Sequence, residues 1–349
     1  MRLVGVRWWS GLSDDLDPLA PEDGIDRYLR HREPSLRESS MRNARTRLRF
    51  FQEWCDERDI ENLNGLAGRD LADFVAWRRG DISAITLQKQ LSTIRMALRY
   101  WADIEAVTEG LAEKLHAPEL PDGAESREVA LDADRAEAIL EYLSDHHYAS
   151  RDHVIMVLLW RTAMRRGALR SIDVGDLEPD DNAIRLEHRP DAGTKLKNGE
   201  DGERWVYLGP TWYQPIEDYL NNPDRHDVTD ENGRQPLITS QHGRPTGDTI
   251  YNWVNKLTQP CKLRGCPHDR DVDTCEALGH EGYPSRCPSA RSPHAIRRGS
   301  ITHHHLNKDV SPEIVSERCD VSLEVLYEHY DVRTEQEKMS VRKRQLEEV

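Results

Sequence analysis

The chain has 349 residues, enough for two domains with separate hydrophobic cores. It carries 63 acidic and 48 basic residues, a formal net charge of -15, which is unusual for a protein that binds phosphate groups. No segment approaches the ~20 apolar residues that span a bilayer, and the apolar stretch at the N-terminus is too short for a signal peptide. We therefore expect a cytoplasmic protein with no membrane association.

Residues 22–104 show apolar positions at helical spacing, which predicts four helices. These helices are expected at residues 22–31, 36–58, 67–79 and 83–104. Basic side chains alternate with the apolar positions of the second and fourth helices: Arg42, Arg45, Arg47, Arg49, Lys89, Arg95 and Arg99. They could follow a nucleic-acid backbone, and the alternative is the solvated face of an ordinary helical bundle.

Prolines, glycines and mixed charge at residues 107–128 predict an interdomain linker. Beyond it, periodicity predicts helices at 133–145, 150–166, 211–221 and 246–258, strands at 183–188 and 203–208, an acidic loop at 222–235, and a mainly helical end. The predicted fold class is mainly α with a small β-sheet (α+β). Its parts are an extension at 1–20, a helical domain at 21–106, the linker, and a second domain at 129–349.

A cysteine-rich insertion at 260–288 interrupts the second domain. Its cysteines are Cys261, Cys266, Cys275 and Cys287. Thiolates gathered in a reducing compartment suggest a tetrahedral, structural Zn²⁺ site, in which His268 or His280 could replace one cysteine. Partly buried free thiols are the alternative.

Three separated segments carry residues suited to phosphate chemistry. His294 and Arg297 stand three residues apart and share one helix face, Arg165 lies far upstream, and a tyrosine-bearing segment spans 325–331. Planar guanidinium groups stabilise the charge that builds on phosphate oxygens during attack at phosphorus. A tyrosine hydroxyl, with a pKa near ~10, needs a base or a cationic field before it attacks. His294 could supply that help, and such a site needs no catalytic metal.

These segments resemble the motifs of the tyrosine recombinase (phage integrase) family. The resemblance rests on residues 162–165, 193–199, 203–208, 294–297 and 298–303, and it covers about residues 20–345. It implies a helical core-binding (SAM-like) domain followed by a catalytic domain, double-stranded DNA as partner, a homo-oligomer (tetramer) on DNA, and no cofactor for catalysis. It also implies five catalytic residues: Arg165, Lys197, His294, Arg297 and Tyr330.

For two of these catalytic roles a second residue nearby is an alternative. The family spacing favours Tyr330, 36 residues after His294, over Tyr327, which is 33 residues after it. Lys197 precedes an Asn-Gly turn signal, in a segment expected to form the incoming strand and turn of a lysine hairpin, and is favoured over Lys195.

Two positions depart from the family pattern. Ala168 stands three residues after Arg165, where the family often has an acidic residue, so we expect Arg165 to be more loosely oriented. Arg318, Cys319 and Asp320 stand near the family's second His or Trp, which leaves one phosphate donor unassigned, with Arg318 as a candidate.

Three classes of function are consistent with the sequence. The first is a site-specific DNA recombinase that forms a 3′-phosphotyrosine link, and the second is a DNA-binding regulator of the same fold with impaired cleavage. The third, a zinc-dependent hydrolase, lacks the His-Glu-x-x-His pattern. The acidic excess and scarce lysine indicate adaptation to high salt, and we infer a halophilic archaeon as the source.

Overall fold

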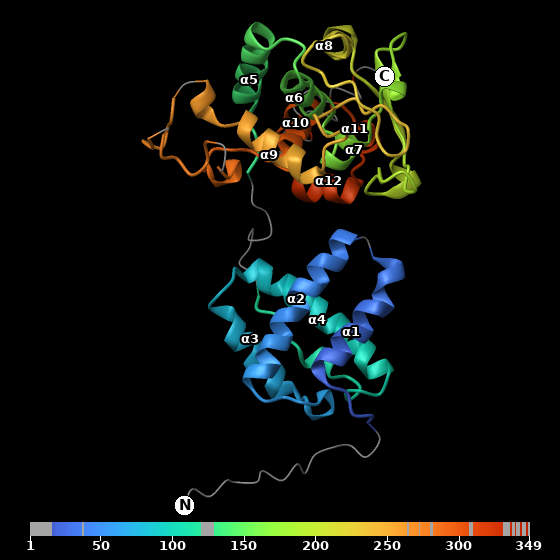
Figure 1. Ribbon diagram of the computed structural model, residues 1–349, viewed down its shortest axis with the longest axis vertical. Helices are drawn as coiled ribbons and strands as arrows, with labels where there is room; N and C mark the ends of the chain where they lie inside the picture. Colours follow the sequence, from blue (N-terminus) through green and yellow to red (C-terminus); the bar gives the residue numbers. More distant parts are fainter. Residues whose placement is uncertain are drawn as a thin grey trace, which may run out of the picture. The chain divides into compact units, whose positions relative to one another are not determined.

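The computed structural model describes residues 16–36, 38–119, 129–263, 265–271, 273–279, 282–306 and 310–330, with positions 336, 339, 343 and 347. The chain divides into two compact units, Met1–Arg127 and Glu128–Val349, each with its own hydrophobic core (Figure 1). The expected fold class, mainly helical with a small sheet, is confirmed.

The first unit is a helical bundle whose elements begin and end within two residues of the expected positions. Its helices are α1 (Pro21–Arg32), α2 (Glu38–Glu57), α3 (Gly68–Arg79) and α4 (Ala84–Asp103). Ser83 accepts a hydrogen bond from the Thr86 N–H at 3.3 Å and so caps α4. The rings of Phe51, Trp54 and Phe74 lie 5.5–5.8 Å apart in the core, so aromatic packing holds α2 to α3.

The segment expected as a linker contributes to this first core. Val107, Leu111 and Leu115 are buried against the bundle, and a short 3₁₀ turn forms at Ala112–Lys114. Residues 107–115 therefore pack onto the first unit, and positions 120–128 lie outside the described residues.

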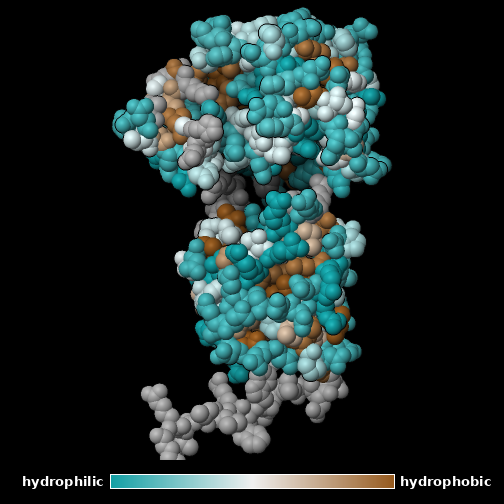
Figure 2. All heavy atoms as spheres, viewed as in Figure 1, coloured by the Kyte–Doolittle hydropathy of each residue, from teal (hydrophilic) through white to brown (hydrophobic). Residues whose placement is uncertain are grey.

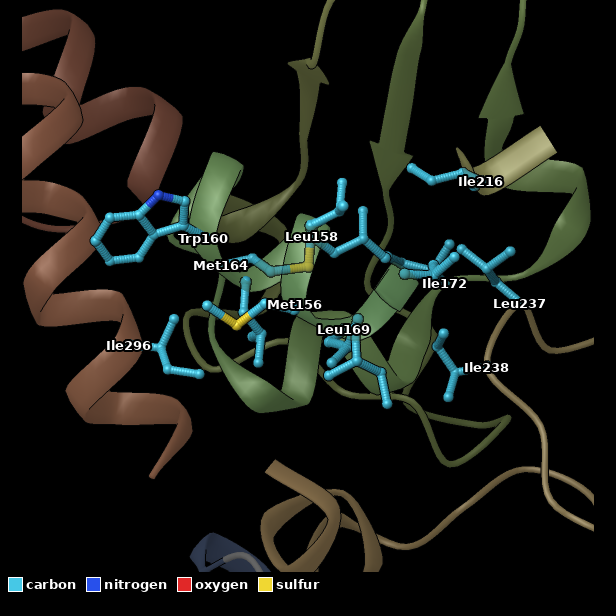
Figure 3. Packing of buried hydrophobic residues seen from close by; sticks show 14 of the residues in the cluster. Met156, Leu158, Trp160, Met164, Leu169, Ile172, Ile216, Leu237, Ile238 and Ile296 are labelled. Atoms are coloured by element: carbon cyan, nitrogen blue, oxygen red, sulfur yellow. The ribbon is translucent and has the colours of Figure 1, made fainter. Parts of the chain in front are cut away.

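The second unit surrounds the almost completely buried helix α6. Its described helices are α5 (Ala133–His146), α6 (Arg151–Thr162), α7 (Arg166–Ser171), α8 (Pro210–Leu220), α9 (Gly247–Leu257), α10 (Pro293–Ser300), α11 (Pro312–Cys319) and α12 (Leu323–His329), and a π-helical turn (Ile301–Leu306) extends α10. Figure 3 shows Trp160 and Met164 near Ile296 of α10 at one end of the core. Helix α6 thus provides a rigid base for the elements around it.

Helix α6 ends four residues earlier than the sequence suggested. Ala163 takes a left-handed conformation, with φ of 53°, and its N–H still bonds to the Leu159 carbonyl. The Met164 N–H then bonds to the Thr162 hydroxyl at 3.2 Å. The chain turns sharply as a result, and Arg165 falls at the start of α7 rather than inside a long helix.

A three-stranded antiparallel sheet covers part of the same core. The strands are β1 (Leu177–Glu178), β2 (Ala183–Leu186) and β3 (Arg204–Tyr207), in the order β1-β2-β3, with Ile184 opposite Val206. The expectation that residues 193–199 form the incoming strand is wrong, because β2 pairs with β3 and 193–199 lie in the long connection between them.

An ion-pair network fastens the acidic loop to the sheet region. Arg244 and Arg234 each bind both Asp173 and Asp230, and all four side chains are at most 17% exposed. Arg189 joins through Asp173, Asp176 and Glu187. In these ion pairs four carboxylates face three guanidinium groups, so the cluster leaves no excess positive charge.

The visible surface is mostly hydrophilic in both units, with scattered apolar patches (Figure 2). This agrees with a chain in which 32% of residues are charged. Among the described residues, no helix combines the length and the apolar character needed to cross a bilayer.

Candidate active site

Arg165 and Asp320 form the centre of the site. Asp320 follows α11 in a left-handed conformation, with φ of 53°, and its carboxylate accepts a hydrogen bond from Arg165 Nη1. The second carboxylate oxygen accepts from Asn198 Nδ2 at 2.5 Å. The expectation of a loosely held Arg165 is therefore wrong: the carboxylate that Ala168 cannot provide comes from Asp320, 155 residues away in sequence.

Arg297 is held by backbone carbonyl groups. Its side chain is 2% exposed, and Nη1 donates to the carbonyl oxygens of Ala163 and Cys319, both at 2.6 Å. Nη2 lies 3.4 Å from the Asp320 carbonyl oxygen. The turn after α6 and the end of α11 thus fix this guanidinium. The left-handed conformations of Ala163 and Asp320 direct backbone carbonyl groups toward it.

A close backbone approach positions α10, which carries both His294 and Arg297. A Cβ atom on Gly299 would lie 1.9 Å from the Leu131 carbonyl oxygen, so only glycine fits there. The Leu131 N–H bonds in turn to the Ala295 carbonyl at 3.0 Å. Ser292 caps the helix by accepting from the Ala295 N–H at 3.3 Å.

His294 lies at the exposed start of α10, in a strongly cationic setting. Partial desolvation, followed by the charges of Arg297, Arg298, Lys197 and Arg165, lowers the pKa of the His294 imidazole from its ordinary value. A lowered pKa keeps the ring neutral near pH 7, which is the form able to accept a proton.

The lysine loop approaches the same place. Lys197 is exposed in a turn with Asn198, and its charge acts on His294. Leu196 anchors the loop, since its side chain is 2% exposed and its N–H donates to His188 Nδ1 at 3.0 Å. Lys195 is also exposed. Because the charge of Lys197 acts on His294, Lys197 is favoured. The choice between the two lysines stays a prediction.

The two candidate tyrosines have different surroundings. Tyr330 is 5% exposed, lies where α12 ends, and its ring centroid is 5.8 Å from the Arg298 guanidinium carbon. A negative charge on the Tyr330 oxygen would raise the pKa of Arg165, so the two side chains belong to the same electrostatic site. Tyr327 is 48% exposed on α12. The geometry favours Tyr330 as the nucleophile, which stays a prediction.

Arg204 is a member of the cluster that sequence reasoning missed. It projects from the start of β3, donates to the carbonyls of Arg318 at 2.9 Å and Gly202 at 2.7 Å, and lies near Asp320, Arg297 and Arg165. Burial lowers the pKa of Arg204 to about 10. The sequence signal that could have identified Arg204 is its position at the start of the outgoing strand.

Arg318, the residue suggested as an additional phosphate donor, is directed elsewhere. Its Nη2 donates to the Arg161 carbonyl at 3.2 Å, and burial lowers the pKa of its guanidinium. Its backbone carbonyl supports Arg204, so its contacts in this structure are with the framework of the site.

The four cysteines of the insertion lie around one small cavity, together with His268. All four are free thiols. Among the described residues, no three His, Cys, Asp or Glu side chains are already arranged to hold a metal ion. His280 lies outside the described residues.

Comparisons with known proteins bear on the N-terminal domain and on the fold. The family model "Phage integrase, N-terminal SAM-like domain" matches residues 25–103. The N-terminal domain of a phage integrase/site-specific recombinase from Haloarcula marismortui is 40% identical, over 29% of this chain and 99% of its own, with a TM-score of 0.29. The Tn1549 transposon integrase, in complex with transposon right end DNA, is 14% identical over 93% of this chain and 99% of its own, with a TM-score of 0.68.

A lambda integrase dimer bound to a COC′ core site is also similar, with 15% identity over 91% of this chain and 79% of its own and a TM-score of 0.64. No curated protein sequence matches the chain. By its N-terminal domain and its fold, the chain belongs to the tyrosine recombinase (phage integrase) family. Members of this family need no cofactor for their chemistry.

Proposed function

We propose that the protein is a site-specific DNA recombinase that cleaves and rejoins double-stranded DNA through a 3′-phosphotyrosine intermediate. One observation carries the proposal: three arginines and a buried tyrosine gather at Asp320, whose carboxylate pairs with one of the three. Arg165 pairs with the Asp320 carboxylate, Arg297 Nη2 lies 3.4 Å from the Asp320 carbonyl oxygen, and the charge of Asp320 acts on Arg204. The ring of Tyr330 lies 5.8 Å from the guanidinium carbon of Arg298 in the same region. The excess positive charge suits a phosphodiester and the additional charge of its transition state.

The proposed reaction uses only side chains of this chain. The Tyr330 hydroxyl oxygen attacks phosphorus, the bond from phosphorus to the 5′ oxygen breaks, and the strand remains linked to the enzyme through its 3′ phosphate. The neutral imidazole of His294 takes the tyrosine proton, while Arg165 and Arg297 neutralise the non-bridging oxygens. Lys197 gives a proton to the departing 5′ oxygen, a task for which arginine is too weak an acid.

The DNA contacts of the first unit are proposed from its exposed arginines. Arg42 pairs with Glu38 at 3.2 Å and Arg49 with Glu53 at 3.3 Å, and all four side chains are at least 46% exposed. Such exposed pairs contribute only ~0–1 kcal/mol, so a phosphate can replace the glutamate at little cost. Arg47 instead donates to Thr93 at 3.0 Å and helps to hold α2 to α4.

We further propose that the protein acts in the cytoplasm of a halophilic archaeon, as a homo-oligomer (tetramer) on DNA. The 63 acidic residues and the hydrophilic surface in Figure 2 support adaptation to high salt. The dimeric assembly of lambda integrase on its core site supports association on DNA.

A nicked suicide DNA substrate, which loses a short fragment on cleavage, tests the proposal. The wild-type protein should form a covalent protein–DNA adduct, Tyr330→Phe should form none while still binding DNA, and Tyr327→Phe should retain the adduct. Adduct formation by Tyr330→Phe that disappears in Tyr327→Phe would reassign the nucleophile.

The second candidate is a DNA-binding regulator of the same fold without cleavage activity. Asp320 favours it, because a carboxylate stands near the position where the family has a histidine or tryptophan donor. Specific DNA binding with no adduct from the wild-type protein, across several candidate target sites at high salt, would support the regulator and overturn the recombinase.

A further inference from the structure

We propose that the insertion between α9 and α10 is a structural zinc knot. Four of the five donor side chains that line one cavity would bind the ion; the five are Cys261, Cys266, Cys275, Cys287 and His268. In Figure 1 this segment leaves the body of the second unit as an orange lobe beside α9. The site is separate from the cluster at Asp320 and takes no part in the proposed cleavage chemistry.

The cavity has the size and the lining of an ion site. Its volume is about 10 Å³, room for a single ion or water and too small for an organic ligand. Thiolate and imidazole are the donors that Zn²⁺ prefers, and four of them complete a tetrahedral structural site. Arg270 lines the same cavity and pairs with Glu276 at 3.6 Å.

His268 provides an independent indication of a missing ligand. Its Nε2 atom is buried with no hydrogen-bond partner among the described residues. A buried polar nitrogen without a partner destabilises the fold, and a metal bond through Nε2 would satisfy it. The nitrogen belongs to a side chain that already lines the thiol cavity.

The lobe lacks a hydrophobic core of its own. Of its described residues, only Ala277 is a buried apolar side chain. Its backbone also adopts positive φ at Gly265, Asp269 and Gly279. No apolar core among the described residues of the lobe stabilises these turns. In a segment with so little core, metal binding supplies the free energy of folding.

The middle and the C-terminal end of the lobe are fixed to the second unit without metal. Gln259 Nε2 donates to the Ala277 carbonyl at 2.8 Å, and Arg135 Nη2 donates to the Ser289 carbonyl at 2.6 Å. The Arg291 N–H donates to the Thr258 hydroxyl at 2.8 Å, just before α10 begins. The thiol groups are not arranged around one point in this structure. Zn²⁺ binding would bring them to Zn–S distances of about 2.3 Å while these hydrogen bonds to the second unit remain.

The test measures metal in the full chain, purified under reducing conditions from cells grown with added zinc. Mass spectrometry of the elements should find about one Zn²⁺ per chain. Cys266→Ser and Cys275→Ser should each lose most of that zinc, whereas Cys55→Ala, which alters a buried thiol of the first unit, should keep it. Replacing Zn²⁺ with Co²⁺ should give the thiolate charge-transfer bands and strong visible absorption of a tetrahedral site.

Metal content and thermal stability can each overturn the proposal. Fully reduced, folded chain with no stoichiometric metal, or with the same zinc content in the Cys266→Ser and Cys275→Ser variants, would exclude a zinc knot. Chelator treatment should also lower the melting temperature, and Zn²⁺ but not Mg²⁺ should restore it. If the melting temperature is identical with and without metal, the structural role is excluded.

Discussion

Two arginine clusters in the second unit have opposite charge balance. At the sheet, Arg189, Arg234 and Arg244 are matched by several carboxylates. At the proposed active site, three arginines gather at Asp320: Arg165 pairs with its carboxylate, whereas Arg204 and Arg297 donate to backbone carbonyl groups. The first arrangement is internally neutralised and fastens a loop, whereas the second retains a net positive charge that an incoming phosphate would neutralise. The number of arginines does not identify an anion site, but their excess over carboxylates does.

The largest expected effect comes from replacing matched arginines in the two clusters. Arg165→Lys keeps the charge but loses the planar fork, so it should slow cleavage about 10²–10³-fold. Arg244→Lys should lower the melting temperature and leave the cleavage rate of the folded protein unchanged. Adduct formation on a suicide substrate and thermal unfolding measure the two quantities. Equal loss of rate in both variants would show that the clusters do not differ in function.

A smaller effect is expected from the carboxylate of the active cluster. Asp320→Asn keeps the side-chain shape and tolerates the positive φ, but weakens the hold on Arg165, so cleavage should slow about tenfold or somewhat more. Adding Ala168→Asp, which places a carboxylate where the family often has one, should recover part of the rate. Faster cleavage by Asp320→Asn alone would mean that this carboxylate repels the DNA phosphate.

The cationic excess should also be visible in the titration of His294. Desolvation and the neighbouring positive charges lower its pKa, so the imidazole stays neutral as the pH falls through the usual histidine value of about 6.5. NMR titration of the DNA-free protein, with His294→Gln to assign the signal, should give a midpoint below that value. Cleavage should persist at pH 6.5 for the same reason. A midpoint at or above 6.5 would contradict the cationic setting.

The smallest effect concerns the balance between the local positive cluster and the net charge of -15. At 0.01 M salt the acidic surface repels DNA over ~30 Å, and added salt screens this repulsion. Affinity for a cognate site, measured from low to molar KCl, should be level or rise at first and then fall gently. A steep, monotonic loss, as for an ordinary basic protein, would contradict adaptation to high salt but not the recombinase proposal.

Local sequence patterns predicted most of the helices but not the contacts that complete the site. Apolar periodicity gave the four helices of the first unit to within two residues, because each buries one continuous face. The early end of α6 escaped prediction, since Ala163 carries no turn signal and takes its left-handed conformation under tertiary constraint. The position of residues 107–115 in the first core was missed because the prolines that follow suggested a linker throughout.

The pairing of Arg165 with Asp320 could not be predicted from either residue alone. Ala168 and Asp320 looked like two separate departures from the family pattern, and only the fold brings Asp320 to Arg165 across 155 positions. Arg204 was missed for a similar reason, since an arginine at the start of a strand is usually solvated, and its burial depends on the carbonyl groups of Arg318 and Gly202.

The backbone contact at Gly299 has a mechanical consequence. Leu131, near the first described residue of the second unit, is bonded to Ala295 and wedged against Gly299, so a pull on the chain at this point loads α10 directly. The load reaches the helix one residue from His294 and two from Arg297. Leu131 therefore connects the preceding chain to α10. Tension on that chain would displace first the residues that are proposed to hold the phosphate.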